Sequence, residues 1–254
     1  MPSTVVLISG ANRGIGKGLL KRYLARPNYT VIAANRDPEH ASSKELADLP
    51  RGTNSHLIVV KVDAAKEKDA IDAVKELEKQ GIEHIDLVIA NAGAAYAFGK
   101  VSEISIDDVK GHFEPNVYGV VRLYQATLPL LLKSSHPKWA TVGSLAGSMA
   151  KWLTDIFQKK QPDAPNSAYG PSKAAVHWFT KAMDREEEKL TAFVIHPGWV
   201  TSDMGNMGAR LFGLEQAPDS LDESCDNLVK LFDEATKETH GGKFWWHNGK
   251  EESW

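Results

Sequence analysis

Residues 5–16 read VVLISGANRGIG and join a short apolar run to a glycine-rich turn. Such a run, rich in β-branched residues, is typical of a strand that is buried on both faces of a sheet. A helical pattern of leucines and Tyr23 follows the turn, and Pro27 is placed to stop that helix. Strand, glycine turn and helix in this order predict the first unit of a parallel α/β sheet.

The same alternation of strands and helices continues along the chain. We predict further strands at 30–34, 56–62, 86–90, 139–142, 191–195 and 243–246. The helical segments between them include long ones at 105–133 and from 169 to about 189. Right-handed crossovers then place helices on both faces of the sheet. The sequence therefore predicts one domain over 1–254, a three-layer, doubly wound Rossmann fold with a parallel seven-stranded sheet.

The composition of the 254 residues, with 42% hydrophobic and 25% charged residues, is that of an ordinary soluble globular protein. A net charge of -3 gives no electrostatic case for binding nucleic acid or an acidic membrane surface. The single cysteine, Cys225, excludes an intrachain disulfide, and the histidines lack metal-ligand spacing, so no metal is expected. The sequence contains neither a signal-peptide pattern nor an apolar run of membrane-spanning length. We expect a cytoplasmic protein.

Gly10, Gly14 and Gly16 lie in the turn that opens the first predicted helix. Backbone amides at a helix N-terminus can face a pyrophosphate, and the missing side chains permit its close approach. The spacing is GxxxGxG rather than GxGxxG, and any glycine-rich strand-to-helix turn could produce it. The turn alone therefore indicates a dinucleotide site without establishing one.

Arg36 lies at the end of the second predicted strand, twenty residues after Gly16. An acidic residue there would bind the ribose 2′-hydroxyl of NAD, whereas an arginine suits a 2′-phosphate. Arg13 in the turn could add a second positive charge, but Asp37 could weaken a phosphate site or reach the ribose itself. The alternative for Arg36 is a solvated loop residue. We predict NADP(H) in preference to NAD(H).

Tyr169 and Lys173 are four residues apart, so they lie on one face of a helix. A neighbouring ammonium group favours the phenolate and lowers the pKa of a tyrosine from its usual ~10. Such a tyrosine can act as a general acid or base near neutral pH. The same spacing occurs by chance on many surface helices, so the pair needs support from the rest of the chain.

Two irregular stretches, 145–166 and 199–218, each follow the end of a predicted strand, where open α/β sheets bind ligands. These stretches contain more large apolar side chains than loops usually do. Packing against the body explains part of it, and the functional alternative is an aromatic-lined pocket for a ring-bearing substrate. Together with Tyr96, the candidate pocket residues are Trp152, Phe157, Trp199, Met204, Met207 and Phe212.

Further motifs follow the glycine turn in a fixed order: NAG at 91–93, Asn116, Ser144, YxxxK at 169–173 and Pro197-Gly198. Together with SGANRGIG at 9–16 they resemble the short-chain dehydrogenase/reductase family over essentially the whole chain. Three longer segments are similar to fungal ketoreductases exemplified by norsolorinic acid ketoreductase, namely AYGPSKAA at 168–175, HPGWVTSDMGNMGARLFG at 196–213 and DEATKETHGGKF at 233–244. The resemblance implies an NADP(H)-dependent ketoreductase or carbonyl reductase of secondary metabolism. Its substrate would be a bulky, aromatic or polyketide-like ketone or aldehyde.

The resemblance also implies catalytic roles. Tyr169 would give a proton to the substrate oxygen as hydride arrives at the carbonyl carbon, and Lys173 would lower the pKa of Tyr169 and bind the nicotinamide ribose. Ser144 would bind and polarise the carbonyl oxygen, with Ser148 as a rival. Asn116 would hold a water that connects Lys173 to solvent. Nicotinamide supplies the hydride, so a tyrosine acid, a hydroxyl donor and a lysine are sufficient groups.

The cofactor contacts implied by the resemblance involve many residues. Asp63 would lie beside the adenine or, alternatively, cap the next helix. Residues 91–93 would line the nucleotide and steady the central sheet, and residues 197–201 would orient the nicotinamide. The full set is Gly10, Asn12, Arg13, Gly14, Ile15, Gly16, Arg36, Asp63, Asn91, Ala92, Gly93, Tyr169, Lys173, Pro197, Gly198, Val200 and Thr201.

Two features depart from the family pattern. Ser144 precedes Tyr169 by 25 residues, more than is typical of the family, so an insertion lies between them. Pro115, directly before Asn116, removes a backbone donor and can kink the predicted helix.

Other functions and states stay open at this point. One is an NADP(H)-sensing binding protein without turnover, and another is an alcohol dehydrogenase of the same family working in the oxidative direction. A related epimerase or dehydratase is a third, although the chain lacks a substantial C-terminal substrate domain. We expect a small-molecule carbonyl or alcohol substrate, with no nucleic acid or membrane as partner. The helices at 105–133 and after Ser167 resemble those of family dimer interfaces, so a homodimer or homotetramer is expected, with a monomer as the alternative.

Overall fold

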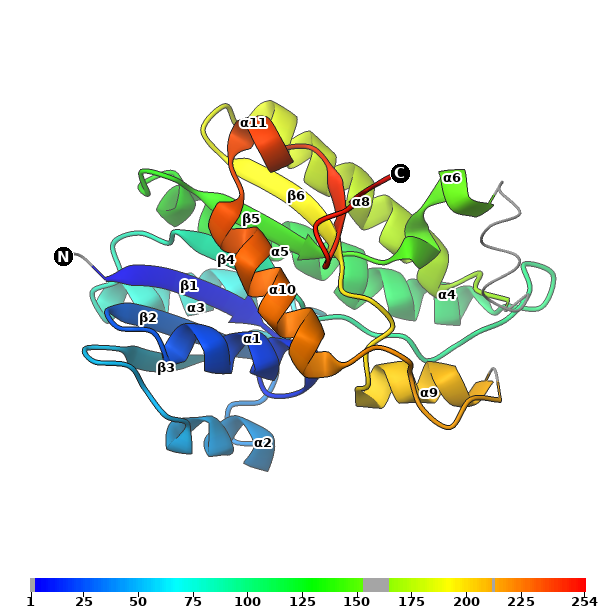
Figure 1. Ribbon diagram of the computed structural model, residues 1–254, viewed down its shortest axis with the longest axis horizontal. Helices are drawn as coiled ribbons and strands as arrows, with labels where there is room; N and C mark the ends of the chain where they lie inside the picture. Colours follow the sequence, from blue (N-terminus) through cyan, green and yellow to red (C-terminus); the bar gives the residue numbers. More distant parts are fainter. Residues whose placement is uncertain (1–2, 153–164, 212) are drawn as a thin grey trace.

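A computed structural model describes residues 3–152, 165–211 and 213–254 (Figure 1). The described strands form one sheet in the order β3-β2-β1-β4-β5-β6-β7-β8. Every neighbouring pair is parallel except β7 and β8, which are antiparallel. The strands are β1 (Thr4–Ser9), β2 (Tyr29–Asn35), β3 (His56–Lys61), β4 (Leu87–Ala90), β5 (Lys138–Val142), β6 (Thr191–His196), β7 (Phe244–Trp246) and β8 (Glu251–Glu252).

The seven strands and the parallel, doubly wound topology predicted from the sequence are confirmed. The structure adds β8, a two-residue antiparallel strand at the sheet edge. Two residues are too few to show a periodic pattern, so the sequence did not indicate this strand.

Helices cover both faces of the sheet and give the predicted three layers (Figure 1). One face packs against α1 (Gly14–Leu24), α10 (Leu221–Glu234) and η1 (Glu45–Asp48), which follows α2 (Ala41–Lys44). The other face packs against α3 (Asp69–Lys79), α5 (Gly119–Leu131) and α8 (Tyr169–Glu186). The remaining described helices are α4 (Ile106–Phe113), η2 (Glu114–Tyr118), η3 (Leu145–Gly147), α6 (Met149–Trp152), α9 (Asp203–Leu211) and α11 (Lys237–His240).

None of the helices in the described ranges is both long and apolar enough to cross a bilayer. The same residues contain no group of three or more histidine, cysteine, aspartate or glutamate side chains that could hold a metal ion.

The strand order reverses direction between β1 and β4. From β1 the chain builds outward through β2 and β3, and it then returns to place β4 on the opposite side of β1. At such a switch point the carboxyl ends of the two strands part, and ligands bind in the crevice between the loops that follow them. In Figure 1 the carboxyl ends of the central strands point to the right, where α4, α6 and α9 lie.

The helical stretch predicted over 105–133 is present but not uniform. A π-helical turn, η2, separates α4 from α5, and Pro115 stands near its start. Pro115 has no amide hydrogen to donate. The helical hydrogen bonds change here from the α to the π pattern, in which the amide of Gly119 donates to the carbonyl of Glu114. The segment is thus helical from 106 to 131, as predicted, with an irregular turn at the place where Pro115 was expected to kink it. This turn contains the fully buried Asn116.

The stretch 199–218 was predicted to be an irregular loop, which is wrong for residues 203–211, because they form α9. Gly205 and Gly208 lower the helix propensity of this segment and hide it in the sequence. The structure gives a reason for Gly205: a β-carbon there would lie 2.0 Å from the carbonyl oxygen of Val200. The first stretch, 145–166, holds η3 and α6 in its described part, and residues 153–164 lie outside the described residues.

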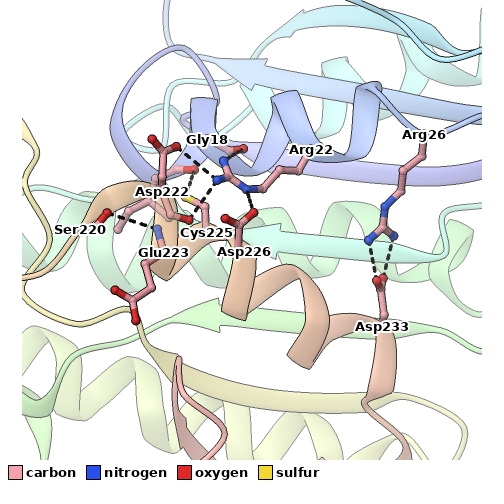
Figure 2. Close-up of polar contacts among 10 residues, drawn as sticks. Gly18, Arg22, Arg26, Ser220, Asp222, Glu223, Cys225, Asp226 and Asp233 are labelled. Atoms are coloured by element: carbon pink, nitrogen blue, oxygen red, sulfur yellow. Dashed lines mark hydrogen bonds and ion pairs between the residues drawn. The ribbon is translucent and has the colours of Figure 1, made fainter.

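Helices α1 and α10 pack closely against each other through a glycine (Figure 2). A β-carbon at Gly18 would lie 2.5 Å from the Sγ of Cys225 and 3.5 Å from its Cβ. On the C-terminal side of this contact Arg22 pairs with Asp226 at 2.6 Å and, further along, Arg26 pairs with Asp233 at 2.6 Å. Each ion pair includes a solvent-exposed carboxylate and contributes under about 1 kcal/mol. The close backbone approach at Gly18 is thus the more specific feature.

We predict that Gly18→Ala lowers the free energy of unfolding by about 1–3 kcal/mol, because the new methyl group overlaps Sγ of Cys225. In a Cys225→Ala background the nearest contact of the new methyl group at residue 18 is the β-carbon of residue 225, at an ordinary van der Waals distance of 3.5 Å. The better helix propensity of alanine then makes the same change neutral or stabilising by up to about 1 kcal/mol. Urea denaturation of the four proteins measures both effects. An equal loss in the two backgrounds would contradict this packing account.

Candidate active site

The carboxyl ends of β1 and β4 are tied together by Ser9 and Asn91. The Ser9 hydroxyl oxygen accepts the backbone amides of Asn91 and Ala92 at 3.0 and 2.9 Å. The Asn91 side chain in turn donates to the carbonyl oxygens of Ser9 and Gly10 at 2.9 and 3.2 Å. The predicted segment 91–93 is thereby fixed against the start of the glycine turn, at the switch point of the sheet.

The glycine turn has a backbone that a β-carbon would block. Gly10 and Gly14 have φ of 65° and 51°, in the left-handed region that favours glycine. A β-carbon at Gly16 would lie 2.2 Å from the carbonyl oxygen of Gly10. Helix α1 begins at Gly14, and its N-cap residue, Arg13, makes no side-chain capping hydrogen bond, while Ile15 in the first turn is half-buried. These features fit the phosphates of a dinucleotide, which bind at uncapped helix N-termini through close backbone approach.

Asn35 also positions this turn, and the sequence analysis missed it. It is fully buried at the end of β2, and its Oδ1 accepts the amide of Ala11 at 2.9 Å. Its Nδ2 donates to Ser43 at 3.3 Å. A polar residue that ends an otherwise apolar strand was the available signal.

The predicted ribose end of the site lies after β2 and β3. Arg36 is exposed there. Asp37 is turned into its own loop, where its Oδ1 accepts the amide of Glu39 at 2.9 Å. Asp63 behaves similarly, since its Oδ1 accepts the amide of Ala65 at 3.0 Å. Asp63 therefore caps a short turn of its own, while α3 begins later, after Lys68. Asn12 in the glycine turn donates to the Ser42 hydroxyl at 2.7 Å and links the turn to α2.

Tyr169, Lys173 and Ser144 come together on the other side of the crevice. Tyr169 is the first residue of α8, and Ser144 follows β5. The two side chains are hydrogen-bonded. Lys173, one turn further along α8, is buried, and its Nζ lies 5.7 Å from the centroid of the Tyr169 ring. The Nζ donates to the carbonyl oxygen of Val142 at 2.7 Å. The end of β5 thus holds both the lysine and the serine.

Asn116 connects these residues to the segment after β4. Its Oδ1 accepts the amide of Ala94 at 2.8 Å, and its Nδ2 donates to the Ala94 carbonyl and to the Ser172 hydroxyl, both at 2.9 Å. A β-carbon at Gly93 would lie 3.0 Å from this Oδ1 and 3.7 Å from Lys173 Nζ. Gly93 therefore lets the amide and the ammonium group face the same small space. Ser172 was not singled out in the sequence.

Burial changes the pKa of both titratable residues. It lowers the pKa of Lys173 to about 8. It raises the pKa of Tyr169 to about 12, against a smaller lowering by the hydrogen bond with Ser144. The sequence analysis expected Lys173 to lower the pKa of Tyr169, and this expectation is wrong for the structure described. The reason is that desolvation of the phenol outweighs the lowering by Ser144, although the residue as a whole is only half-buried.

The two rival serines are in different surroundings. Ser144 caps η3, and its hydroxyl oxygen accepts the amide of Ala146 at 3.1 Å beside Tyr169. Ser148 is fully buried and donates its hydroxyl hydrogen to the carbonyl oxygen of Ser253 at 2.8 Å. Of the two, the structure brings Ser144 to the tyrosine.

Residues 197–201, after β6, are held by Asp219. Its carboxylate accepts the amide of Trp199 at 2.6 Å, and its carbonyl oxygen accepts the amide of Thr201 at 2.9 Å. Gly198 has a φ of 88°, and a β-carbon there would lie 2.7 Å from the same carboxylate. Val200 forms a bridge with Asp219. Asp219 was missed because twenty residues separate it from the segment that it positions.

The candidate pocket residues are only partly described. Tyr96 is 52% exposed and stacks on His112 with ring centroids 4.2 Å apart. Trp199 is half-buried, and its Nε1 donates to the Gly205 carbonyl at 2.9 Å. Met204 and Met207 lie on α9, the first exposed and the second half-buried. Trp152 ends α6, and Phe157 and Phe212 lie outside the described residues.

Comparison with known proteins gives a consistent result. A family model described as short chain dehydrogenase matches residues 4–209. Norsolorinic acid ketoreductase nor1 of Dothistroma septosporum is 44% identical to this chain, covering 96% of it and 90% of the relative. Norsolorinic acid ketoreductase of Aspergillus parasiticus is 39% identical, covering 99% and 91%. An NADPH-bound carbonyl reductase from chicken fatty liver superposes with a TM-score of 0.83 at 26% identity, with both chains fully covered. These matches confirm the resemblance read from the motifs.

The low pKa of Lys173 predicts a pH-dependent stability. Below about pH 8 the lysine is charged in both the folded and the unfolded chain, so folding must bury a charge. Between about 8 and the unfolded value of 10.5 the unfolded chain binds more protons, and stability rises with pH. Relative to Lys173→Met, the unaltered protein should gain on the order of 3 kcal/mol of unfolding free energy across this window, at about 1.4 kcal/mol per pKa unit.

Denaturation of both proteins at several pH values between 7 and 10.5 measures this difference, with the unfolded pKa as the upper limit. Lys189→Met, at an exposed position, is the control for the chemical change itself. A pH-independent difference between Lys173→Met and the unaltered protein would show that the ammonium group is not desolvated.

Proposed function

The chain belongs to the short-chain dehydrogenase family of oxidoreductases, and from that premise we propose that it is an NADPH-dependent ketoreductase. Its proposed substrate is a bulky ketone or aldehyde of aromatic or polyketide-like type, as in secondary metabolism. The hydrogen-bonded pair of Ser144 and Tyr169 beside buried Lys173 is the observation that carries the proposal. Lys173 also lies close to Gly93, in the segment that follows β4.

The proposed mechanism uses few groups of the protein. NADPH, when bound, supplies the hydride. Tyr169 donates its phenolic proton to the substrate oxygen, and the raised pKa keeps this proton in place until negative charge develops on that oxygen. The Ser144 hydroxyl, which donates to the Tyr169 oxygen in this structure, would turn its hydrogen to the same substrate oxygen and stabilise the developing charge.

Lys173 has two proposed tasks, to bind the nicotinamide ribose and to supply positive charge beside Tyr169. Its burial leaves the ammonium group poorly solvated, which strengthens its interaction with any hydroxyl or phenolate that reaches it. Asn116 is proposed to hold a water that returns a proton through Lys173. Two hydrogens of its side-chain amide are already donated, to Ala94 and Ser172, so Oδ1 is the atom placed to bind such a water.

Preference for NADPH is supported by the position of Arg36. Its exposed side chain follows β2, where the 2′-substituent of the adenosine ribose would lie. The rival acceptor at this place, Asp37, has one of its two carboxylate oxygens engaged by the amide of Glu39. The NADPH named for the chicken carbonyl reductase agrees with this choice.

The aromatic nature of the substrate rests on two observations. Two relatives, 44% and 39% identical to this chain, are named norsolorinic acid ketoreductases. In addition, Tyr96, Trp199 and the methionines of α9 supply flat or polarizable apolar surface near the carboxyl edge of the sheet. The oxidative direction with an alcohol substrate is the alternative for the same residues.

A dinucleotide-sensing protein without turnover is the second candidate. It requires the glycine turn and Arg36 but has no use for a hydroxyl pair that is desolvated beside a lysine. Calorimetry would support the sensor if NADPH bound while no ketone, quinone or aldehyde in a broad panel oxidised it.

Self-association stays a prediction. Ile106 on α4, Tyr118 on η2 and Trp178 on α8 are exposed apolar residues, with 67%, 50% and 67% of their surface accessible. They lie on the helices that the sequence resemblance associates with a dimer or tetramer, and light scattering decides between these states and a monomer.

Replacing Tyr169 by phenylalanine should reduce kcat by about 10²- to 10⁴-fold, because a general acid contributes roughly this factor. NADPH consumption with a panel of aromatic ketones and quinones is the measurement. NADPH affinity should stay within about 3-fold, and Tyr118→Phe, at an exposed position, is the matched control. Near-normal turnover by Tyr169→Phe would refute the proposed acid.

Arg36→Asp should lower kcat/KM for NADPH by roughly 10- to 100-fold, because hydrogen bonds to charged groups contribute about 1.5–3 kcal/mol each. Activity with NADH should be retained or increased. Steady-state kinetics with both cofactors gives the ratio, and Arg51→Asp, the same charge change at an exposed position, controls for net charge. An unchanged ratio would remove Arg36 from the cofactor site.

A further inference from the structure

Two histidine rings accept hydrogen bonds from the backbone at Ser144. The amide of Ser144 donates to Nε2 of His177 at 3.2 Å, and the next amide, of Leu145, donates to Nδ1 of His196 at 3.4 Å. His177 lies on α8, one turn after Lys173, and His196 ends β6. Two consecutive amides at the end of β5 thus find imidazole nitrogens as their acceptors.

The His177 ring is held in one protonation state. It is 3% exposed, and burial, with a smaller effect of the Lys173 charge, lowers its pKa to about 3. Because Nε2 accepts a hydrogen bond, the proton of the neutral ring must be on Nδ1. Among the described residues this Nδ1 has no hydrogen-bond partner. A buried donor without an acceptor costs about 1–3 kcal/mol, so His177 is a poor choice for stability alone.

The surroundings of His177 fix the position of its ring. Phe244 lies against it with ring centroids 4.7 Å apart, and Trp254 meets it edge-on at 5.9 Å. A β-carbon at Gly143 would lie 2.4 Å from Nε2. Because Gly143 has no side chain, the His177 ring can approach the end of β5. The two aromatic residues restrict its movement away from that position.

The geometry of Ser144 depends on this acceptor. Rotation of the peptide bond that precedes Ser144 would move its Cα and carry the hydroxyl away from Tyr169. The neighbouring hydroxyl contact, from the amide of Ala146, constrains Oγ but not that peptide. A displacement of about 1 Å in a group that contacts the reacting atoms can reduce a rate by about 10²-fold.

We propose that His177 is a positioning residue, whose neutral imidazole orients Ser144 toward the substrate oxygen by accepting the Ser144 amide, with His196 holding the next amide in the same way. The inference rests on the proposed function, in which Ser144 contacts the substrate. His177 itself touches neither substrate nor cofactor in this account.

The test compares His177→Leu, which removes the acceptor, with His177→Gln, whose side-chain oxygen reaches the position of Nε2. With phenanthrenequinone and NADPH, His177→Leu should lower kcat by about 10- to 100-fold while the calorimetric Kd for NADPH changes less than about 3-fold. His177→Gln should recover most of the loss. If the glutamine variant were as slow as the leucine variant with equal thermal stability, the proposal would be overturned.

A Ser144→Ala background separates positioning from a structural role. If His177 acts through the Ser144 hydroxyl, His177→Leu should change kcat by less than about 2-fold once that hydroxyl is absent. An unchanged 10- to 100-fold loss in this background would overturn the inference and leave the proposed function standing. Undiminished kcat in Ser144→Ala alone would instead remove Ser144 from the proposed mechanism, and the inference with it.

A spectroscopic measurement tests the inference without turnover. Long-range ¹H–¹⁵N spectra of the full chain should show His177 with the proton on Nδ1 and a bare Nε2 from about pH 5 to about pH 8, as the geometry requires. A protonated Nε2 in this range would exclude the hydrogen bond from Ser144 and would overturn the proposal.

Discussion

The hydrogen bonds between Ser9 and Asn91 are the constraint on which the rest of the crevice depends. They link the carboxyl end of β1 to the carboxyl end of β4 through two backbone amides and two backbone carbonyls. The glycine turn begins on one side of this junction, and the segment that leads to Gly93 begins on the other. Gly93 then leaves room for Asn116 and Lys173, so a contact at the sheet centre sets the positions of groups on α8 and η2.

The candidate site is less favourable for stability than a core of the same size would be. It contains a buried lysine, a partly buried tyrosine far from its ordinary pKa and a buried histidine nitrogen without a partner in the described structure. Proteins keep such locally unfavourable groups mainly where function requires them. The apolar residues of the two sheet faces, which are almost completely buried, provide the stability that allows this arrangement.

The sequence predicted the sheet well because its strands are buried on both faces and read as continuous apolar runs. It also identified Ser144, Tyr169 and Lys173, which short motifs mark and the structure brings together. It failed where distant parts of the chain decide the result. Gly205 lowers local helix propensity, yet α9 forms because that glycine fits against the Val200 carbonyl. Asn35, His177 and Asp219 each act on a segment far away in sequence, and the pKa of Tyr169 depends on burial that no motif encodes.

The last residues of the chain contact the segment that follows Ser144. The carbonyl oxygens of Ser253 and Trp254 accept hydrogen bonds from Ser148 and Ala150, and the Trp254 ring packs against Phe244. In Figure 1 this end lies beside α8, whereas the first described residues lie at the amino edge of the sheet. For immobilisation or labelling, the regions near Trp254 and near Ser3 are therefore not equivalent: a group attached near Trp254 would press on its contacts with Ala150 and Phe244, in the segment after Ser144 and in β7, whereas one near Ser3 would not.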